Sequence, residues 1–596
     1  MGVRAIFQLE TPWSENEVFD LGYEQGTGVM VFTHLDHDPQ RLTRYGHDNW
    51  TLAPAVYVAT VAAPSNFVVT ANAPNMGTGY VATEYGYTVT TIDEATGQES
   101  LEAGGQTGVT DLTLKGNTVD MTWDAVPGAE RYNVYRAGGG VYGFIGTTEH
   151  PKFRDDNIAP DFSQSFPRQR TPFADANNKP AVVAFWNQRA VYARTYNKPN
   201  GVFASQIGNL FNMNVARPTV ATDAVTFAVT GWRVNAVLHL VPLKNLLVFT
   251  TDTIFSVDKA FSPTEITVIP EGYRAACRVR PVVIDDIAMF GTQKGASIRT
   301  LGYQFEADGY RGNDLTVFAP HLFLNVTLVD MCWSEFPTST VSAVMSDGAV
   351  RLLTWQQEQQ VWGWSKMTTD GVIESCCTVS EGGEDVVYYI VKRGTKRYVE
   401  YTASSRWADV ADAVYLDSAV RYVGEPADTF SGAYHLAGKT IDVLADGAAY
   451  QAIQVSAEGG FSLPQEASKV VAGLPFEAWI RTLPLGAEQV KGEPKAIANA
   501  VVHVLRSRGL EVGIGKNLPP GVFEPTTSDD EVFGLMDEIK TRELESLGDP
   551  TELFSGELPV DVECGDWRTA DVVVRQRYPL PMHITGITPD YVLSDL

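Results

Sequence analysis

The sequence predicts a mainly β protein whose largest part is a β-propeller. Its 596 residues include 52 Gly and 32 Pro, with many Val, Thr and Tyr, a composition typical of strands and tight turns. Between residues 180 and 402, a unit of apolar strand, short polar turn and apolar strand recurs at intervals of roughly 45–60 residues, within reach of propeller blade lengths. The chain is also too long for one core, so roughly three or four domains are expected.

The recurring units have the form of a blade's inner hairpin, with Asn, Asp or Lys in the turn. They read "PAVVAFWNQRAVYAR", "NAVLHLVPLKNLLVFTTDTIFSV", "RPVVIDDIAMFGTQKGASIRTLG", "VSAVMSDGAVRLLTWQQEQQVWGWSK" and "GEDVVYYIVKRGTKRYVEY". We therefore predict the main β-propeller at 166–410. A hairpin near the chain start has the same form, so residues 1–54 are expected to supply the propeller's N-terminal part.

That first hairpin, "VFTHLDHDPQRLTRYGHDNWTL", gathers residue types that bind metals or transfer protons. The candidates are His34, Asp36, His37, Asp38, His47 and Asp48. In a continuous strand, His34 and Asp36 would share one face and His37 would point the opposite way. Metal binding would then need the turn to gather them. The favoured interpretation is a polar turn, so we predict no metal-binding, cofactor-binding or catalytic residue and no cofactor.

Residues 55–165 have a different character and predict an inserted sandwich domain. In "NTVDMTWDAVPGAERYNVYRAGGGVYGFIGTTEH", Trp123 sits in an alternating strand, and Tyr132, Val134 and Arg136 alternate in the next. This segment resembles the core signature of a fibronectin type III domain, which would make Trp123 and Tyr132 core residues. The glycine triplet is a hairpin tip and no phosphate loop, because no helix follows it.

The C-terminal third predicts additional β-domains. Alternating strands and turns indicate a small β-domain at 411–485. Residues 486–596 predict a C-terminal β segment with an acidic loop, which spans about 516–560. Within the loop, "DDEVFGLMDEIKTRELESLG" is expected to form a short helix, and the loop is expected to be exposed.

Charge and cysteine content exclude several classes of protein. The formal net charge is −27, so the basic surface that binds nucleic acid non-specifically is not expected; an acidic surface would instead repel DNA. No apolar run approaches the ~18 residues of a membrane span, and the N-terminus lacks a signal-peptide core. The cysteines are few and irregularly spaced, which favours reduced thiols and cytoplasmic assembly: Cys277, Cys332, Cys376, Cys377 and Cys564.

Other motifs that suggest chemistry have plainer interpretations. "AGKT" at 437–440 lacks the spacing of a phosphate-binding loop, and a strand is expected after it. No G-x-S-x-G elbow is present, although a Ser/His/Asp triad needs no fixed spacing. Asp285-Asp286 is expected in a turn and Asp529-Asp530 at the start of a helix. These positions are favoured over a role as the paired carboxylates of a glycosidase. The group Trp355, Trp362 and Trp364 favours sheet packing over a carbohydrate platform.

Several segments together resemble the tail nozzle proteins (tail tubular protein B-like) of short-tailed bacteriophages, the podoviruses. "VMVFTHLDHDPQRLTRYGHDNWTL" is similar to the family's segment y-f-x-H-x-x-x-x-P-x-x-L-x-R-x-x-x-x-x-W-x-L. "AVVAFWNQRAVYARTYNKPNGVFASQIGNLFNM", "VPLKNLLVFTTDTIFSV", "LGYQFEADGYRGNDLTVFAPHL" and "HLAGKTIDVLADG" also resemble it. The resemblance spans about residues 10–510; the inserted sandwich and the last part of the chain are less characteristic.

The resemblance implies a structural virion protein and no enzyme. Such proteins form a ring, typically a homohexamer, at the distal end of the tail, and are assembled in the host cytoplasm. The ring docks beneath the tail adaptor under the portal, encloses the channel for DNA ejection and holds it closed until infection. Genomic DNA passes without specific binding, and tail fibres or spikes are further partners. The alternatives are a β-propeller tail protein that binds or cleaves glycans, or a receptor-binding tail fibre component.

Overall fold

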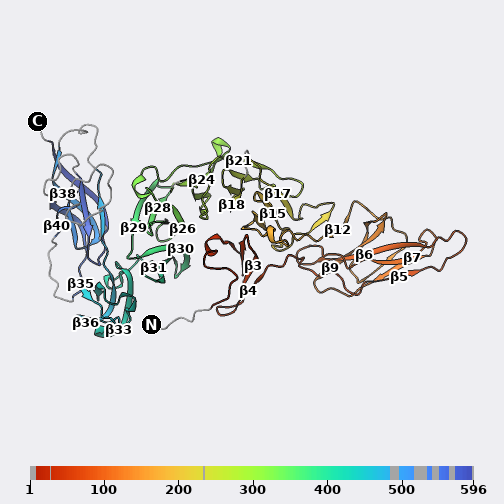
Figure 1. The fold of residues 1–596 in the computed structure, drawn as a ribbon, viewed down its shortest axis with the longest axis horizontal. Helices are drawn as coiled ribbons and strands as arrows, with labels where there is room; N and C mark the ends of the chain where they lie inside the picture. The colour runs from red at the N-terminus through yellow and green to blue at the C-terminus, as the bar shows by residue number, and fades with distance from the viewer. Residues whose placement is uncertain are drawn as a thin grey trace. The chain divides into compact units, whose positions relative to one another are not determined.

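The computed structural model describes residues 8–26, 28–231, 235–294, 296–483, 495–515, 533–539, 549–562 and 571–593. The chain divides into two compact units, 1–315 and 316–596, and each is taken by itself. Both units are built from antiparallel sheets (Figure 1). Within the described residues, every helical segment is a three-residue 3-10 helix: η1 (Val18–Asp20), η2 (Ala176–Asn178), η3 (Phe305–Ala307), η4 (Pro320–Leu322), η5 (Val410–Asp412) and η6 (Tyr434–Leu436).

Four sheets of the first unit are propeller blades, each with four antiparallel strands in up-and-down order. Blade 1 contains β1 (Gly22–Gly26), β2 (Val29–His34), β3 (His37–Arg44) and β4 (Trp50–Pro54). Blade 2 contains β13 (Val182–Trp186), β14 (Arg189–Ala193), β15 (Gly201–Ala204) and β17 (Val225–Ala228). Blade 3 contains β18 (Val237–Pro242), β19 (Leu246–Thr250), β20 (Ile254–Val257) and β21 (Val268–Gly272). Blade 4 contains β22 (Val282–Ile284), β23 (Ile287–Gly291), β24 (Ile298–Gln304) and β25 (Gly309–Arg311).

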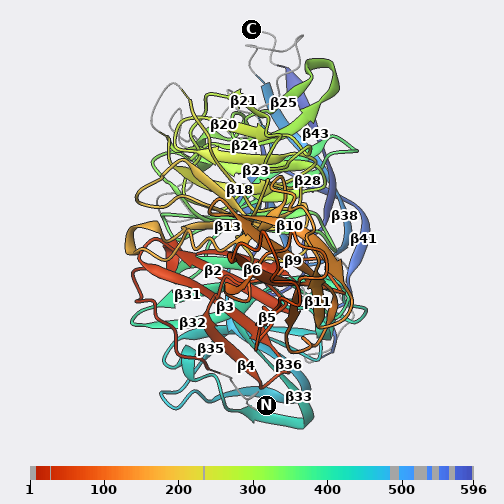
Figure 2. The ribbon, with the colours of Figure 1, turned by 90° about the vertical axis from the view of Figure 1, so that its right-hand side faces the viewer.

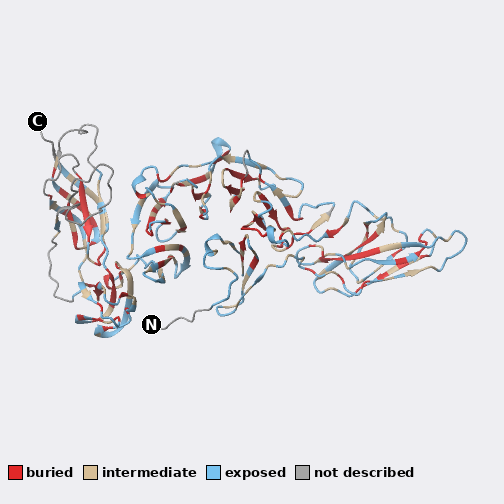
Figure 3. Cartoon of the chain, in the orientation of Figure 1, coloured by how far each residue is buried: buried red, intermediate tan, exposed pale blue. Residues whose placement is uncertain are grey.

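The blades of the first unit pack face to face through apolar side chains. β13 lies against β1 and β2 of blade 1 and against β18 of blade 3. Between blades 3 and 4, the rings of Phe249 and Phe290 lie 5.1 Å apart in one core. Figure 2 shows strands of these two blades stacked, and Figure 3 shows buried positions concentrated in the strands. Because both faces of an inner blade are covered, β19 is buried at every position and lacks polar alternation.

Strands β5–β11 follow blade 1 in the sequence and form a two-sheet sandwich. One sheet contains, in spatial order, β10 (Val141–Thr148), β9 (Ala129–Gly138), β6 (Thr83–Asp93) and β7 (Gln106–Thr110); the other contains β11 (Lys152–Asp155), β8 (Thr118–Thr122) and β5 (Val68–Asn72). Trp123 and Tyr132 are buried in the shared core, with ring centroids 5.3 Å apart. The Tyr132 hydroxyl also accepts a hydrogen bond from the Val126 amide at 2.9 Å. Membership of the fibronectin type III class stays a prediction.

A cluster of buried amides ties this sandwich to blade 2. The Gln98 side chain donates to the carbonyl of Ile207 (3.2 Å) and accepts from the amides of Asn209 (3.1 Å) and Asn212 (3.2 Å). Those three partners lie in the segment between β15 and β17. A further two-stranded sheet pairs β12 (Ser165–Arg168), at the end of the insertion, with β16 (Val215–Arg217) of that same segment. Hydrogen bonds therefore fix the insertion to the loop of one blade.

The second unit begins with two further sheets of blade type. Blade 5 contains β26 (Leu328–Ser334), β27 (Thr340–Met345), β28 (Val350–Gln356) and β29 (Val361–Met367). Blade 6 contains β30 (Val372–Glu381), β31 (Glu384–Arg393) and β32 (Lys396–Tyr401). β30 packs against β26 and β27, and the core between the two blades includes Cys332, Ile373 and Tyr389. The blade pattern thus continues to Tyr401.

Three sheets complete the second unit. The first contains, in spatial order, β33 (Asp417–Phe430), β36 (Phe461–Leu474), β34 (Thr440–Ala445) and β35 (Ala448–Gln454). The second contains β37 (Ala478–Arg481), β42 (Val572–Gln576), β39 (Leu510–Gly515) and β40 (Phe533–Glu538). The third contains β41 (Phe554–Asp561), β38 (Lys495–Ser507) and β43 (Ile584–Leu593), with β38 and β41 side by side in Figure 2. The last two sheets share a core that includes Val502, Val512 and Val574.

Two expectations for the C-terminal part differ from the structure. Residues 533–538, expected within a short helix, form β40, because their backbone pairs with β39 and this tertiary pairing outweighs local helix propensity. Most of the predicted acidic loop, with Asp529-Asp530, lies outside the described residues. β37 falls within the range predicted for the small β-domain, but it pairs with β42 of the C-terminal sheet.

Candidate functional site

The histidines of the first hairpin meet at its turn. β2 ends at His34 and β3 begins at His37, so Leu35 and Asp36 form the connection. His34 and His37 are cross-strand partners, and opposite residues of an antiparallel pair share one face. Their ring centroids lie 5.1 Å apart. The expectation that the two rings point to opposite faces is wrong, because it assumed one continuous strand and the chain reverses between them.

A register shift beside the turn also changes which residues share a face. Phe32 pairs with Gln40 and His34 pairs with His37, so β3 has one more residue than β2 over this interval. This is a β-bulge, which re-aims the side chains next to it. Pro39 lies within the bulge, where its missing N–H costs no ladder hydrogen bond. Sequence alternation alone cannot locate such a shift.

A third group, Glu17, joins the two histidines from the segment before η1. One of its carboxylate oxygens, Oε1, lies 3.2 Å from Nε2 of His37. The other, Oε2, accepts hydrogen bonds from the backbone amide and the hydroxyl of Ser14, both at 2.7 Å. One potential ligand atom from each of Glu17, His34 and His37 lies within 4.8 Å of the others. The sequence contains no signal for Glu17, which is far from the hairpin and precedes blade 1.

The surroundings of Glu17 keep its carboxylate charged. The hydrogen bonds from Ser14, followed by the hydrogen bond with His37, lower the pKa of Glu17 to about 2. His34 is buried, whereas His37 and Glu17 are partly exposed. Among the described residues, the hydrogen bonds and ion pairs recorded for these three side chains involve no lysine or arginine. The cluster therefore presents one negative charge and imidazole nitrogens without a protein cation.

The remaining polar residues of the hairpin have other partners. Asp36 accepts from the Tyr196 hydroxyl (3.1 Å), Asp38 pairs with the Lys179 ammonium, and Nδ1 of His47 lies 3.3 Å from the Arg44 guanidinium. Asp48 is exposed. Of the six candidate residues, His34 and His37 meet at the cluster, and Asp36 stays beside His34, with its amide 3.2 Å from Nδ1. Asp38 and His47 pair with residues outside the cluster.

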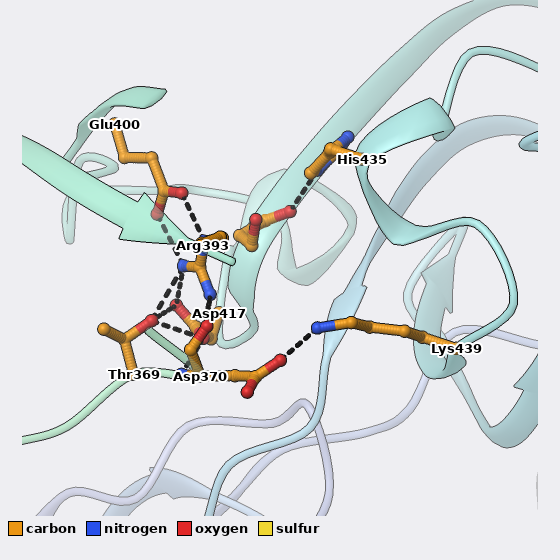
Figure 4. A network of polar contacts seen from close by, with 8 residues as sticks. Thr369, Asp370, Arg393, Glu400, Asp417, His435 and Lys439 are labelled. Atoms are coloured by element: carbon orange, nitrogen blue, oxygen red, sulfur yellow. Dashed lines mark hydrogen bonds and ion pairs between the residues drawn. The ribbon is translucent and has the colours of Figure 1, made fainter. Parts of the chain in front are cut away.

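A second polar cluster, here called the junction network, lies in the second unit between blade 6 and β33 (Figure 4). The guanidinium of Arg393 donates to both carboxylate oxygens of Glu400 (2.7 and 2.8 Å) and to Asp417 (3.1 Å). Thr369 accepts from Arg393 (2.7 Å) and donates to Asp417 (2.8 Å). Lys439 forms an ion pair with Asp370, the residue after Thr369. These contacts join four chain segments that are distant in sequence.

In the junction network, every carboxylate faces a cation. Burial of Arg393 favours loss of its proton, but the hydrogen bond to Glu400 and the charge of Asp417 outweigh burial, so the pKa of Arg393 is raised. The ion pair with Lys439 lowers the pKa of Asp370. Donors and acceptors are thus matched within the protein, which suits a structural joint.

Other residues singled out in the sequence take structural positions. Asp285 and Asp286 form the exposed connection between β22 and β23. The strand expected after "AGKT" is β34, which begins at Thr440. No helix therefore follows Lys439 to hold a phosphate group.

The tryptophans of blade 5 pack against other aromatic rings. Trp355 and Trp362 are cross-strand partners with ring centroids 5.8 Å apart. Trp364 contacts Phe323, at a centroid distance of 4.9 Å. Trp355 is buried and Trp362 is half exposed.

Two general expectations concern the state of the cysteines and the presence of membrane-spanning helices. Cys277, Cys332, Cys376 and Cys377 are free thiols, and Cys564 lies outside the described part. Within that part, no helix is both long enough and apolar enough to span a lipid bilayer.

Comparisons with known proteins add little to this picture. No family model and no curated protein matches the chain. Among solved structures, U3-55K matches with 12% identity and a TM-score of 0.26, covering 64% of this chain and 95% of that one. The crystal structure of RRP9 WD40 repeats matches with 13% identity and a TM-score of 0.25, covering 63% and 87%. At such low TM-scores the likeness carries no argument, and the fold assignment here rests on strand topology.

Proposed function

We propose that the chain is a tail nozzle subunit of a short-tailed bacteriophage. In this proposal it is a structural virion protein at the distal end of the tail, where copies form a ring, typically of six. The ring encloses and gates the DNA ejection channel and docks on the tail adaptor. The resemblance in the first hairpin carries the proposal, because it matches the family's segment at six spaced positions: His34, Pro39, Leu42, Arg44, Trp50 and Leu52.

Four of those six positions have roles in folding blade 1, which supports a structural protein. Leu42 and Leu52 are cross-strand partners in β3 and β4. The guanidinium of Arg44 lies 5.6 Å from the ring centre of Trp50, a cation–π distance. The Trp50 indole also donates to the carbonyl of His47 at 3.1 Å. Strand pairing and turn contacts thus account for these four positions.

The charge of the chain suits a channel that DNA must leave quickly. A net charge of −27 gives an average repulsion of phosphate, and an acidic lumen would keep DNA from adhering during ejection. Under this proposal, a ring with a net positive lumen would be evidence against a repulsive channel.

The inserted sandwich has a supporting part in the proposal. Its buried amide bonds to the loop of blade 2 hold it to the propeller, as a module presented to a partner requires. Tail fibres, spikes or a neighbouring subunit are the partners that the proposal offers for it.

Native mass spectrometry of the full chain, alone and mixed with the tail adaptor, tests the proposal. The expected result is a closed oligomer, near six times the 65.1 kDa of one chain, in at least one of the two conditions. A monomer in both conditions, with binding or cleavage on a glycan panel, would favour the glycan-active alternative. A trimer in both conditions would favour a tail fibre component.

A further inference from the structure

The three side chains at the tip of blade 1 have the chemistry of a metal site. They come from two places in the chain: Glu17 from the segment before η1, and His34 and His37 from facing strands. Imidazole nitrogen and carboxylate oxygen are the donors of many zinc sites, including those with two histidines and one glutamate. Two imidazoles and one carboxylate lie in one place, and among the described residues their hydrogen bonds and ion pairs involve no lysine or arginine, so a cation from solution can bind there.

The separation between two of the donors fits a bound zinc ion. At zinc–ligand distances of about 2.0–2.1 Å, two ligands of a tetrahedral site lie roughly 3.3 Å apart. Nε2 of His37 and Oε1 of Glu17 are 3.2 Å apart. The third donor lies within 4.8 Å of both, so a side-chain shift of up to about 1.5 Å completes the set.

The neighbours of Glu17 support its use as a ligand. Ser14 holds Oε2 with two hydrogen bonds of 2.7 Å and leaves Oε1 directed at His37. Outer hydrogen bonds of this kind orient ligating carboxylates and tune metal affinity.

Two contacts must adjust for a metal to bind. Nε2 of His37 donates its hydrogen to the Glu17 carboxylate, so His37 must carry that hydrogen on Nδ1 instead. One contact of His34 must change as well. The Asp36 amide lies 3.2 Å from Nδ1 of His34, a long hydrogen bond that leaves the proton of the neutral ring on Nε2. Binding through Nδ1 replaces that bond, because the single lone pair of Nδ1 cannot accept a hydrogen bond and coordinate a metal at the same time.

We propose that Glu17, His34 and His37 bind one Zn²⁺ ion per chain, with a fourth position open to water or to a group from a partner. The ion would fasten the segment before η1 to the hairpin tip of blade 1. Nitrogen and carboxylate donors favour Zn²⁺ over Mg²⁺ and Ca²⁺, which prefer all-oxygen sites. The inference does not depend on the proposed function.

The test uses the untagged full chain, stripped with a chelator and titrated with Co²⁺ as a spectroscopic probe of low-coordinate sites. Zn²⁺ affinity is then measured by competition with a chromophoric chelator. The expected result is one Co²⁺ per chain with visible absorption that Zn²⁺ abolishes. Glu17→Gln and His37→Ala should each weaken Zn²⁺ binding by about tenfold or more, because loss of a mere outer-shell partner already costs about that much.

His47→Ala is the matched control, since His47 lies in the same hairpin but contacts Arg44 outside the cluster. It should bind Zn²⁺ like the unaltered chain. Circular dichroism and the thermal midpoint show whether each variant folds; Glu17→Gln changes only one carboxylate oxygen and should keep the fold. Absence of stoichiometric Co²⁺ binding, or equal weakening by His47→Ala, would overturn the proposal and leave a simple His37–Glu17 hydrogen bond.

Discussion

The polar clusters of the two units differ in how their charges are balanced. In the junction network, Arg393 and Lys439 face Glu400, Asp417 and Asp370, so each carboxylate has a cation within the protein. At the tip of blade 1, Glu17, His34 and His37 converge with no lysine or arginine among their recorded contacts in the described residues. A matched cluster holds a structure together. A cluster of metal-binding side chains without a protein cation is a candidate ligand site.

The largest loss of stability is expected from a substitution in the junction network, where charges are matched. Arg393→Met leaves Glu400 and Asp417 facing each other without their cation, and should lower the free energy of unfolding by about 3 kcal/mol. Urea unfolding followed by tryptophan fluorescence measures it. Arg397→Met is the control, because Arg397 pairs with Glu374 on an exposed face of the same blade and such pairs contribute about 1 kcal/mol or less. Equal losses in both variants would mean that the junction network is no stronger than a surface pair.

The second-largest loss of stability is expected in the amide cluster between the sandwich and blade 2, where uncharged donors and acceptors are matched. Gln98→Ala removes one donor and an acceptor shared by Thr60, Asn209 and Asn212, and leaves the amides of Asn209 and Asn212 buried without that partner. The expected loss is about 2 kcal/mol, with faster proteolysis between the sandwich and blade 2. Gln164→Ala, which removes one exposed bond to Asp161, should stay within about 0.5 kcal/mol. If Gln98→Ala changes neither the free energy of unfolding nor the rate of proteolysis, these amide bonds do not stabilise the contact between the sandwich and blade 2.

His239 has a hydrogen-bond partner within the protein and can be compared with the histidines of the blade 1 cluster. Burial lowers the pKa of His239 to about 4, and Nε2 lies 2.9 Å from the carbonyl of Cys277. As pH falls from about 6.5 to 4, the unfolded chain takes up a proton that the folded chain does not, so stability falls. The expected loss is about 1–2 kcal/mol, allowing for partial exposure of the ring.

His239→Gln keeps a donor for the carbonyl and removes the titration. Its unfolding free energy should therefore fall less between pH 7 and pH 4.5 than that of the unaltered chain. The measurement is urea unfolding at both pH values. An identical pH dependence of the two proteins would contradict neutral burial of His239.

The sequence predicted the strand-rich fold better than the sites. Apolar runs around short polar turns marked the blade hairpins, because strand burial and turn chemistry are local properties. The meeting of His34 and His37 could not be predicted, since it depends on where the chain reverses and on a bulge at Pro39. Glu17 and the junction network need contacts between distant segments. β40 shows the same limit, because pairing with β39 decided its conformation.

Electron microscopy of the purified chain, alone and mixed with the tail adaptor, tests the central claim most directly. The account predicts a closed ring of identical subunits around a central channel, with the sandwich anchored to each propeller and acidic side chains along the lumen. Single propeller-shaped particles or elongated fibres in both conditions would contradict it.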